Sequence, residues 1–176
     1  GAVARVFDPS RHLGVISIGI AGALPGGGLA LLDSVLASAS VFADEGSENP
    51  EGYADIASLG FAPTAGIPGG RPGMAIAASA ALSTLLEARC ARTGVIATVS
   101  TCAGSDARAA EVVRRTGAIA EAMEGGAAGL ALARVTAGAG LFAELRIISN
   151  TTGERGQQAW RLRDALDRLG SLAASL

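Results

Sequence analysis

The chain has 176 residues, enough for one domain with a sizeable hydrophobic core, and its formal net charge is −2 at pH 7. Every basic residue except His12 is an arginine and aromatic residues make up only 3%, so the sequence lacks the basic, aromatic-rich surface of a nucleic-acid-binding protein. Its apolar stretches, such as 74–82 and 127–133, are far shorter than the roughly 20 residues of a membrane-spanning helix. We expect a single domain over residues 1–176 that binds neither nucleic acid nor membrane.

The cysteine and histidine content predicts no metal site. Cys90 and Cys102 are the only cysteines, they form no Cys-x-x-Cys pair, and the chain has one histidine. This pattern is typical neither of a disulfide framework nor of a zinc centre. The first residues show no apolar segment typical of an export signal. We therefore expect a protein of the reducing cytoplasm that needs no metal or organic cofactor.

The first half of the chain is predicted to contain two strands and a long helix, separated by turns and loops. In chain order these elements lie at 15–21 (strand), 22–28 (glycine-rich turn), 32–43 (strand), 44–51 (acidic loop), 60–73 (loop rich in glycine and proline) and 74–92 (helix).

The second half is predicted to alternate regularly between strands and helices. Strands are expected at 94–100, 119–123 and 141–149, and helices at 106–115, 125–137 and 157–174, the last with a continuous apolar face. This alternation predicts an α/β fold with a mixed β-sheet flanked by helices. Because ligands of such sheets bind at strand ends, we expect Gly22, residues 101–104, Glu124 and Asn150 to converge on one crevice.

Two short motifs carry a family resemblance. Residues 122–126 read Ala-Met-Glu-Gly-Gly, and residues 147–150 read Ile-Ile-Ser-Asn. A Met-Glu pair that opens a small-residue helix, followed by an apolar strand ending in a polar pair, resembles the nucleoside phosphorylase and nucleosidase superfamily. The resemblance implies a nucleoside phosphorylase-like three-layer fold and a small-molecule nucleoside as the substrate.

Further segments resemble one family of nucleosidases, the futalosine hydrolases of menaquinone biosynthesis. They are residues 148–155 (Ile-Ser-Asn-Thr-Thr-Gly-Glu-Arg) with Trp160, 44–46 (Asp-Glu-Gly), 50–53 (Pro-Glu-Gly-Tyr) and 59–61 (Leu-Gly-Phe). This resemblance covers nearly the whole chain. It implies hydrolysis of the N-glycosidic bond of futalosine, which releases hypoxanthine and dehypoxanthinyl futalosine.

The resemblance also implies roles for individual residues. Glu124 and Asn150 would be catalytic: the Glu124 carboxylate would accept hydrogen bonds from the ribose diol and favour a cationic sugar, and the Asn150 amide would hold a 6-oxopurine. The remaining predicted substrate contacts are Ile20, Ala21 and Gly22 (close backbone approach), Thr101 (base pocket), Met123 (surface beneath the ribose), Ser149 (beside Asn150) and Phe61 (the 5′ group, across the interface of a homo-oligomer).

Each of these residues also has a purely structural interpretation. Glu124 is equally the exposed first residue of a helix, Asn150 is a common residue at the start of a turn, and an isolated phenylalanine such as Phe61 is most often part of the core. The glycines around Gly22 commonly punctuate turns. Without the resemblance, these interpretations are the simpler ones.

One expected element of the family pattern is missing. The resemblance places a further strand before Gly1, followed by an acidic residue that activates the attacking water, and neither Asp8 nor Asp33 matches it. Either the given sequence lacks this strand or the base lies elsewhere, so the water-activating residue stays unassigned. Two related activities stay open as alternatives, methylthioadenosine/adenosylhomocysteine nucleosidase and purine nucleoside phosphorylase. A catalytically silent nucleoside-binding protein is the alternative that is not an enzyme.

Overall fold

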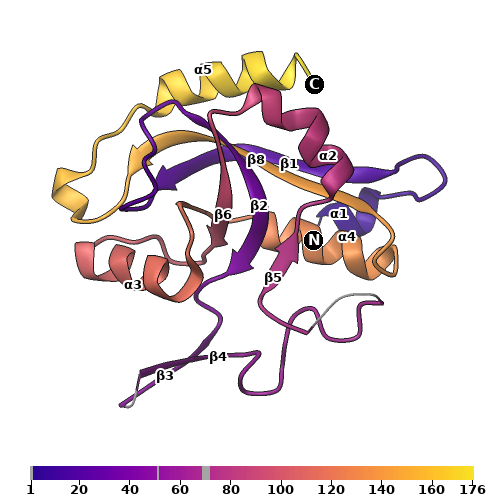
Figure 1. Cartoon of the computed structure of the whole chain (residues 1–176), viewed down its shortest axis with the longest axis horizontal. Helices are drawn as coiled ribbons and strands as arrows, with labels where there is room; N and C mark the ends of the chain where they lie inside the picture. The colour runs from indigo at the N-terminus through magenta and orange to yellow at the C-terminus, as the bar shows by residue number, and fades with distance from the viewer. Residues whose placement is uncertain (1, 51, 69–71) are drawn as a thin grey trace.

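The computed structural model describes residues 2–50, 52–68 and 72–176, and Figure 1 shows the arrangement of its helices and strands. A six-stranded sheet has the order β5-β2-β6-β7-β1-β8, and β8 pairs with β2 as well. Five strands therefore form a closed ring, which β5 extends at β2. The strands are β1 (Gly14–Ala23), β2 (Ser34–Phe42), β5 (Ala75–Ala77), β6 (Arg92–Thr98), β7 (Ala120–Ala122) and β8 (Leu141–Thr151).

The sheet is mixed and has helices on both sides. The pairs β1–β8, β2–β6 and β6–β7 are parallel, whereas β1–β7, β2–β8 and β2–β5 are antiparallel. In Figure 1, α2 (Ala80–Leu86) and α5 (Leu162–Ala173) lie above the sheet, and α3 (Asp106–Thr116) and α4 (Gly125–Val135) lie below it. The short α1 (Ala2–Val6) lies beside α4. This arrangement confirms the predicted α/β class.

Strand β8 is the centre of the core. Its residues from Phe142 to Asn150 are all buried, as expected of a strand covered on both faces. Ten residue pairs join it in parallel to β1, and the register shifts at a bulge between Ala21 and Gly22. The bulge lies where β1 reaches the end of the sheet that holds the predicted site residues.

Helix α3 illustrates how local sequence sets an element's ends. The Ser105 side chain accepts a hydrogen bond from the Arg108 N–H at 3.2 Å, which caps the first turn. Gly117 then ends the helix in the left-handed conformation, with φ 65°, a conformation that glycine adopts without strain. Ala109 and Val112 are the buried residues of the helix, and they pack in the cluster that includes Ala97 and Val99.

Two predicted elements of the first half were wrong. The helix expected at 74–92 is β5, α2 and a short 3₁₀ helix (Glu87–Arg89), and Arg92 already belongs to β6. Antiparallel pairing of β5 with β2 overrides the helical preference of its alanines. The acidic loop expected at 44–51 contains β3 (Gly46–Asn49), which pairs with β4 (Gly52–Asp55); Glu51 itself lies outside the described residues.

Several boundaries near the site also differ from the prediction. Strands β1 and β8 run on to Ala23 and Thr151, so Gly22 and Asn150 lie within strands rather than after them. Strand β7 ends one residue before Met123, and α5 begins at Leu162. The segment before α5 is held by a bridge between Trp160 and Asn150, a contact without a periodic signal in the sequence.

Within the described ranges 2–50, 52–68 and 72–176, no helix is both long and apolar enough to span a membrane.

Candidate functional site

A cavity of about 260 Å³ lies at the ends of the parallel strands β1 and β8, beside the short strand β7. Most of the predicted site residues line it. Its lining consists of Ile20, Ala21, Gly22, Cys102, Ala103, Glu121, Ala122, Met123, Glu124, Ser149, Asn150, Arg155, Gln158 and Trp160. The Met-Glu pair, the Ser-Asn pair and the end of β1, which are far apart in sequence, therefore surround one space.

Glu124 reaches this cavity from the position just before the first turn of α4. Its side chain is 65% exposed, yet one oxygen is held by the buried guanidinium of Arg146, with 2.9 Å between Nη1 and Oε2. Arg146 also pairs with Glu144 at 2.7 Å and donates to the Ser17 hydroxyl at 3.1 Å. Arg146 thus fixes the carboxylate that faces the cavity.

Glu144 is the fully buried counterpart of this arginine. Its second oxygen accepts a hydrogen bond from the Ser40 hydroxyl, so both oxygens have partners. Two carboxylates around one guanidinium leave the cluster with one net negative charge. Because Arg146 stays compensated by Glu144, the negative charge at the cavity belongs to Glu124.

Two glycines make room for this ion cluster. A Cβ added at Gly19 would lie 2.1 Å from Arg146 Nη1, and a Cβ added at Gly125 would lie 1.9 Å from Glu144 Oε2. Any side chain at either position would collide with a buried charged group. Gly125 therefore allows α4 to begin directly against the ion cluster.

Asn150 is buried at the other end of the cavity, with 8% of its surface exposed. Its Nδ2 donates to the Thr151 carbonyl at 2.9 Å, and its Oδ1 accepts from the Ser149 hydroxyl at 2.9 Å. These contacts fix the orientation of the amide. Because an amide has two N–H groups and a carbonyl oxygen with two lone pairs, one donor and one acceptor position remain for a ligand.

Gly22 and Met123 shape the space between these polar groups. A Cβ at Gly22 would lie 2.9 Å from Thr152 Cγ2 and 3.1 Å from Asn150 Nδ2, so a side chain here would crowd Asn150. Met123 is 51% exposed and lines the cavity next to Glu124, although methionine side chains are often buried. The cavity thus combines an apolar surface with a charged end and an amide end.

Two predicted contacts do not line this cavity. Thr101 is exposed, and its backbone N–H donates to Asp44 at 2.9 Å; its neighbours Cys102 and Ala103 line the cavity instead. Phe61 is 74% exposed and lies in the loop between β4 and β5. Arg71, which belongs to the loop predicted at 60–73, lies outside the described residues.

Sequence reasoning missed three buried charged residues, Glu121, Glu144 and Arg146. A signal for the last two was present: residues 144–146 read Glu-Leu-Arg inside an apolar strand, and residues two apart share one face of a strand. For Glu121 the signal was weaker, one acid between two alanines in a short strand. Burial raises the pKa of the Glu121 carboxyl, against the effect of its hydrogen bond from the Ala103 N–H.

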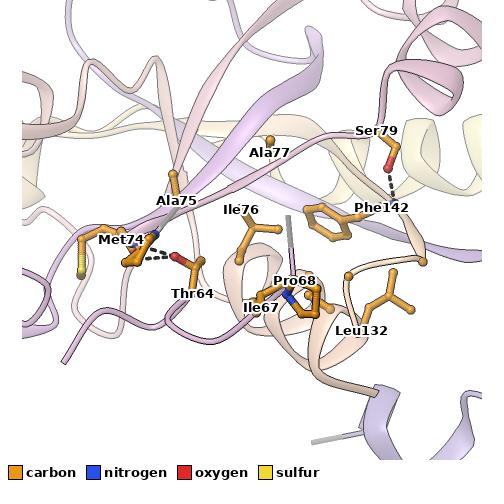
Figure 2. Close-up of a pocket in the computed structure, with 16 residues that line it drawn as sticks. Thr64, Ile67, Pro68, Met74, Ala75, Ile76, Ala77, Ser79, Leu132 and Phe142 are labelled. Carbon is orange, nitrogen blue, oxygen red and sulfur yellow. Dashed lines mark hydrogen bonds between the residues drawn. The ribbon is translucent and has the colours of Figure 1, made fainter. Parts of the chain in front are cut away.

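A larger cavity, of about 600 Å³, lies elsewhere, between β5, α4 and the loop around Thr64 (Figure 2). Ile67, Ile76, Leu132 and Phe142 form much of its wall. Its described lining contains no acidic, basic or histidine side chain, whereas the smaller cavity is lined by Glu121, Glu124 and Arg155. The smaller cavity is therefore the candidate site.

The described part of the chain contains no group of three or more His, Cys, Asp or Glu residues that could hold a metal ion.

Comparison with known proteins places this chain in a family. The Phosphorylase superfamily matches residues 4–176. Futalosine hydrolases of Streptomyces coelicolor and Acidothermus cellulolyticus are each 38% identical over 171 residues, which is 92% and 94% of this chain. The chain spans 66% and 65% of the length of these curated relatives.

Solved structures share the fold at lower identity. An S-adenosylhomocysteine nucleosidase from Streptococcus pyogenes superposes with a TM-score of 0.68 at 23% identity, covering 98% of this chain and 70% of that one. A futalosine hydrolase mutant of Helicobacter pylori strain 26695 gives 0.65 at 22% identity, covering 99% and 74%. With a match over residues 4–176 and this common fold, the chain belongs to the phosphorylase superfamily.

Proposed function

We propose that the protein is an N-glycosyl hydrolase that cleaves futalosine into hypoxanthine and dehypoxanthinyl futalosine, a step of menaquinone biosynthesis. The single observation that carries the proposal is the pairing, in one cavity, of the Arg146-held carboxylate of Glu124 with the fixed amide of Asn150. The 38% identity to two futalosine hydrolases supports this substrate over other nucleosides.

Glycosidic bond cleavage needs help at both ends of the breaking bond. As the bond lengthens, positive charge develops on the sugar and negative charge on the base, and preorganised groups at these two places lower the barrier. In the proposed arrangement Glu124 accepts hydrogen bonds from the ribose hydroxyls and stabilises the cationic sugar. Arg146 keeps this carboxylate in place but, being shared with Glu144, does not cancel the negative charge of the cluster.

Asn150 is proposed to hold the departing base. Its free N–H donates to the purine O6, and its free carbonyl lone pair accepts from N7–H as the base leaves. A 6-amino purine presents a donor where this amide also presents a donor, so the arrangement favours hypoxanthine over adenine. Ser149 supports the role by fixing Oδ1, while Met123, Ile20, Ala21 and Gly22 provide the walls of the ribose and base pocket.

Two further parts of the proposal concern the assembly and its location. Phe61 is 74% exposed and outside the cavity, which fits a homo-oligomer in which it contacts the 5′ group of a substrate bound to the neighbouring subunit. Because Thr101 does not line the cavity, we propose that it affects the base pocket only indirectly. Its backbone helps to hold the loop whose next residues, Cys102 and Ala103, line the cavity. We propose a cytoplasmic location, and the two free cysteines suit a reducing compartment.

The proposed reaction is tested by incubating the protein with futalosine in phosphate-free buffer and following hypoxanthine by chromatography. Release of hypoxanthine supports hydrolysis, and release only after phosphate is added identifies a phosphorylase. Methylthioadenosine, tested in parallel, identifies the alternative nucleosidase if it is the better substrate. Tight binding of futalosine without turnover identifies a silent binding protein.

A further inference from the structure

One buried carboxyl oxygen at the candidate site has no partner. Glu121 lines the cavity from β7 and is only 4% exposed. Its Oε1 accepts a hydrogen bond from the Ala103 N–H at 2.9 Å, but for Oε2 there is no hydrogen-bond donor among the described residues. A buried polar atom without a hydrogen bond destabilises the folded protein by about 1–3 kcal/mol. A ligand that donates a hydrogen bond to this oxygen would remove that cost.

The sheet places Glu121 opposite Asn150. Gly22 of β1 pairs with Glu121 on one side and with Asn150 on the other, so the two residues are two strand spacings apart, roughly 10 Å. A Cβ at Gly22 would lie 3.6 Å from Glu121 Cγ and 3.1 Å from Asn150 Nδ2. Both side chains therefore reach over the same glycine, which leaves a slot between a carboxyl group and an amide.

The edge of a 6-oxopurine fits this pair of groups. In the departing base, N7–H, O6 and N1–H follow one another along that edge, as donor, acceptor and donor. Asn150 has a donor free for O6, whereas the adjacent N1–H requires an acceptor. The terminal torsion of a glutamate is soft, so a small rotation turns Oε2 toward the slot.

We infer that Glu121 is a base-recognition residue whose Oε2 accepts a hydrogen bond from N1–H of the purine that Asn150 holds. The inference rests on the proposed function and adds to it a second group that selects the base. Adenine carries a lone pair at N1, which the carboxylate repels. Glu121 and Asn150 then discriminate against adenine at two separate atoms of the base.

Binding of the free bases tests this role directly. Dissociation constants for hypoxanthine and adenine are measured by calorimetry for the wild type and for Glu121→Gln. The glutamine can still accept from the Ala103 N–H but presents an NH₂ group to the slot. Hypoxanthine is expected to bind roughly tenfold more weakly or worse, and adenine more tightly, because the new N–H donates to its N1.

Two further variants separate base recognition from a structural role. Glu87→Gln removes an exposed carboxylate of the 3₁₀ helix Glu87–Arg89, outside the cavity lining, and it is expected to leave both affinities unchanged. Glu121→Asp keeps the negative charge, but its side chain is one methylene shorter and holds the carboxylate farther from the base. Hypoxanthine binding is therefore expected to weaken without a gain for adenine.

The outcomes are distinct from those that test the overall reaction. If Glu121→Gln weakens hypoxanthine and adenine equally, or changes neither, the inference is wrong even when futalosine is hydrolysed normally. A wild type that binds hypoxanthine no better than adenine also overturns it. Opposite shifts for the two bases uphold it, and they do so even if futalosine itself proves not to be the substrate.

Discussion

At the scale of single residues, the proposed mechanism depends on one carboxylate held by a shared arginine. Glu124 is largely exposed to the cavity, while Arg146 and Glu144 behind it are buried. The buried pair is charge-balanced without Glu124. Glu124 can therefore be changed without leaving an unpaired buried charge, which makes it a clean probe of mechanism.

Glu124→Gln is expected to keep the fold and to lower kcat/KM strongly. The amide retains the size of the side chain but loses the charge that stabilises the cationic sugar, and the loss of one such electrostatic contact costs about 3 kcal/mol of transition-state stabilisation. Steady-state kinetics on futalosine measure the effect. Glu154→Gln, an exposed carboxylate outside the cavity lining, is the control, and near wild-type kinetics for Glu124→Gln would remove Glu124 from the mechanism.

Asn150→Asp is expected to shift preference from 6-oxo toward 6-amino purine nucleosides. The Thr151 carbonyl lies where Nδ2 now donates, so it disfavours an ionised aspartate, and only the protonated acid can donate to N7. The ratio of kcat/KM for inosine to that for adenosine measures the shift. An equal loss on both substrates would mean that Asn150 only shapes the strand end.

At the scale of elements, the start of α4 is coupled to the buried ion cluster. Gly125→Ala would place a Cβ against Glu144 Oε2 and is expected to lower the free energy of unfolding by about 1–3 kcal/mol, as overpacking does. Gly170→Ala is the matched control: it lies in α5 with open space around it, and alanine there is expected to add about 0.5–1 kcal/mol.

Chemical denaturation of the two glycine variants checks this coupling. Opposite changes in stability support it, and an unchanged midpoint for Gly125→Ala would show that α4 can shift away from Glu144 without cost.

The elements also show how far the sequence predicts this molecule. Strands β1, β6 and β8 and helices α3 and α4 follow from apolar runs, capping residues and glycines, and the two motifs predicted that Glu124 and Asn150 face one cavity. Strand β5 could not be foreseen, because its identity comes from pairing with β2. Glu121 could not be predicted because its partner, the Ala103 N–H, comes from a loop. The role of Arg146 depends on Ser17 of β1 and on Glu124 at the start of α4.

At the scale of the whole molecule, Phe61 tests the proposed homo-oligomer. Futalosine carries a bulky aromatic acid at its 5′ end, and the cavity residues account only for base and ribose. Phe61→Ala is expected to raise KM for futalosine far more than for inosine, because inosine lacks that group. Kinetics with both substrates, together with the mass of the assembly in solution, test whether Phe61 contacts the 5′ group across a subunit interface. A fully active monomer, or equal effects on both substrates, would contradict the proposal.

The central claim, hydrolysis of a 6-oxopurine nucleoside with futalosine as the substrate, is tested most directly by one competition assay. Futalosine, inosine and methylthioadenosine are mixed in equal amounts in phosphate-free buffer with the wild-type protein, and the bases released are separated and quantified. We expect futalosine to be consumed first and hypoxanthine to appear without added phosphate. Consumption of methylthioadenosine first, with adenine as the main product, would contradict it.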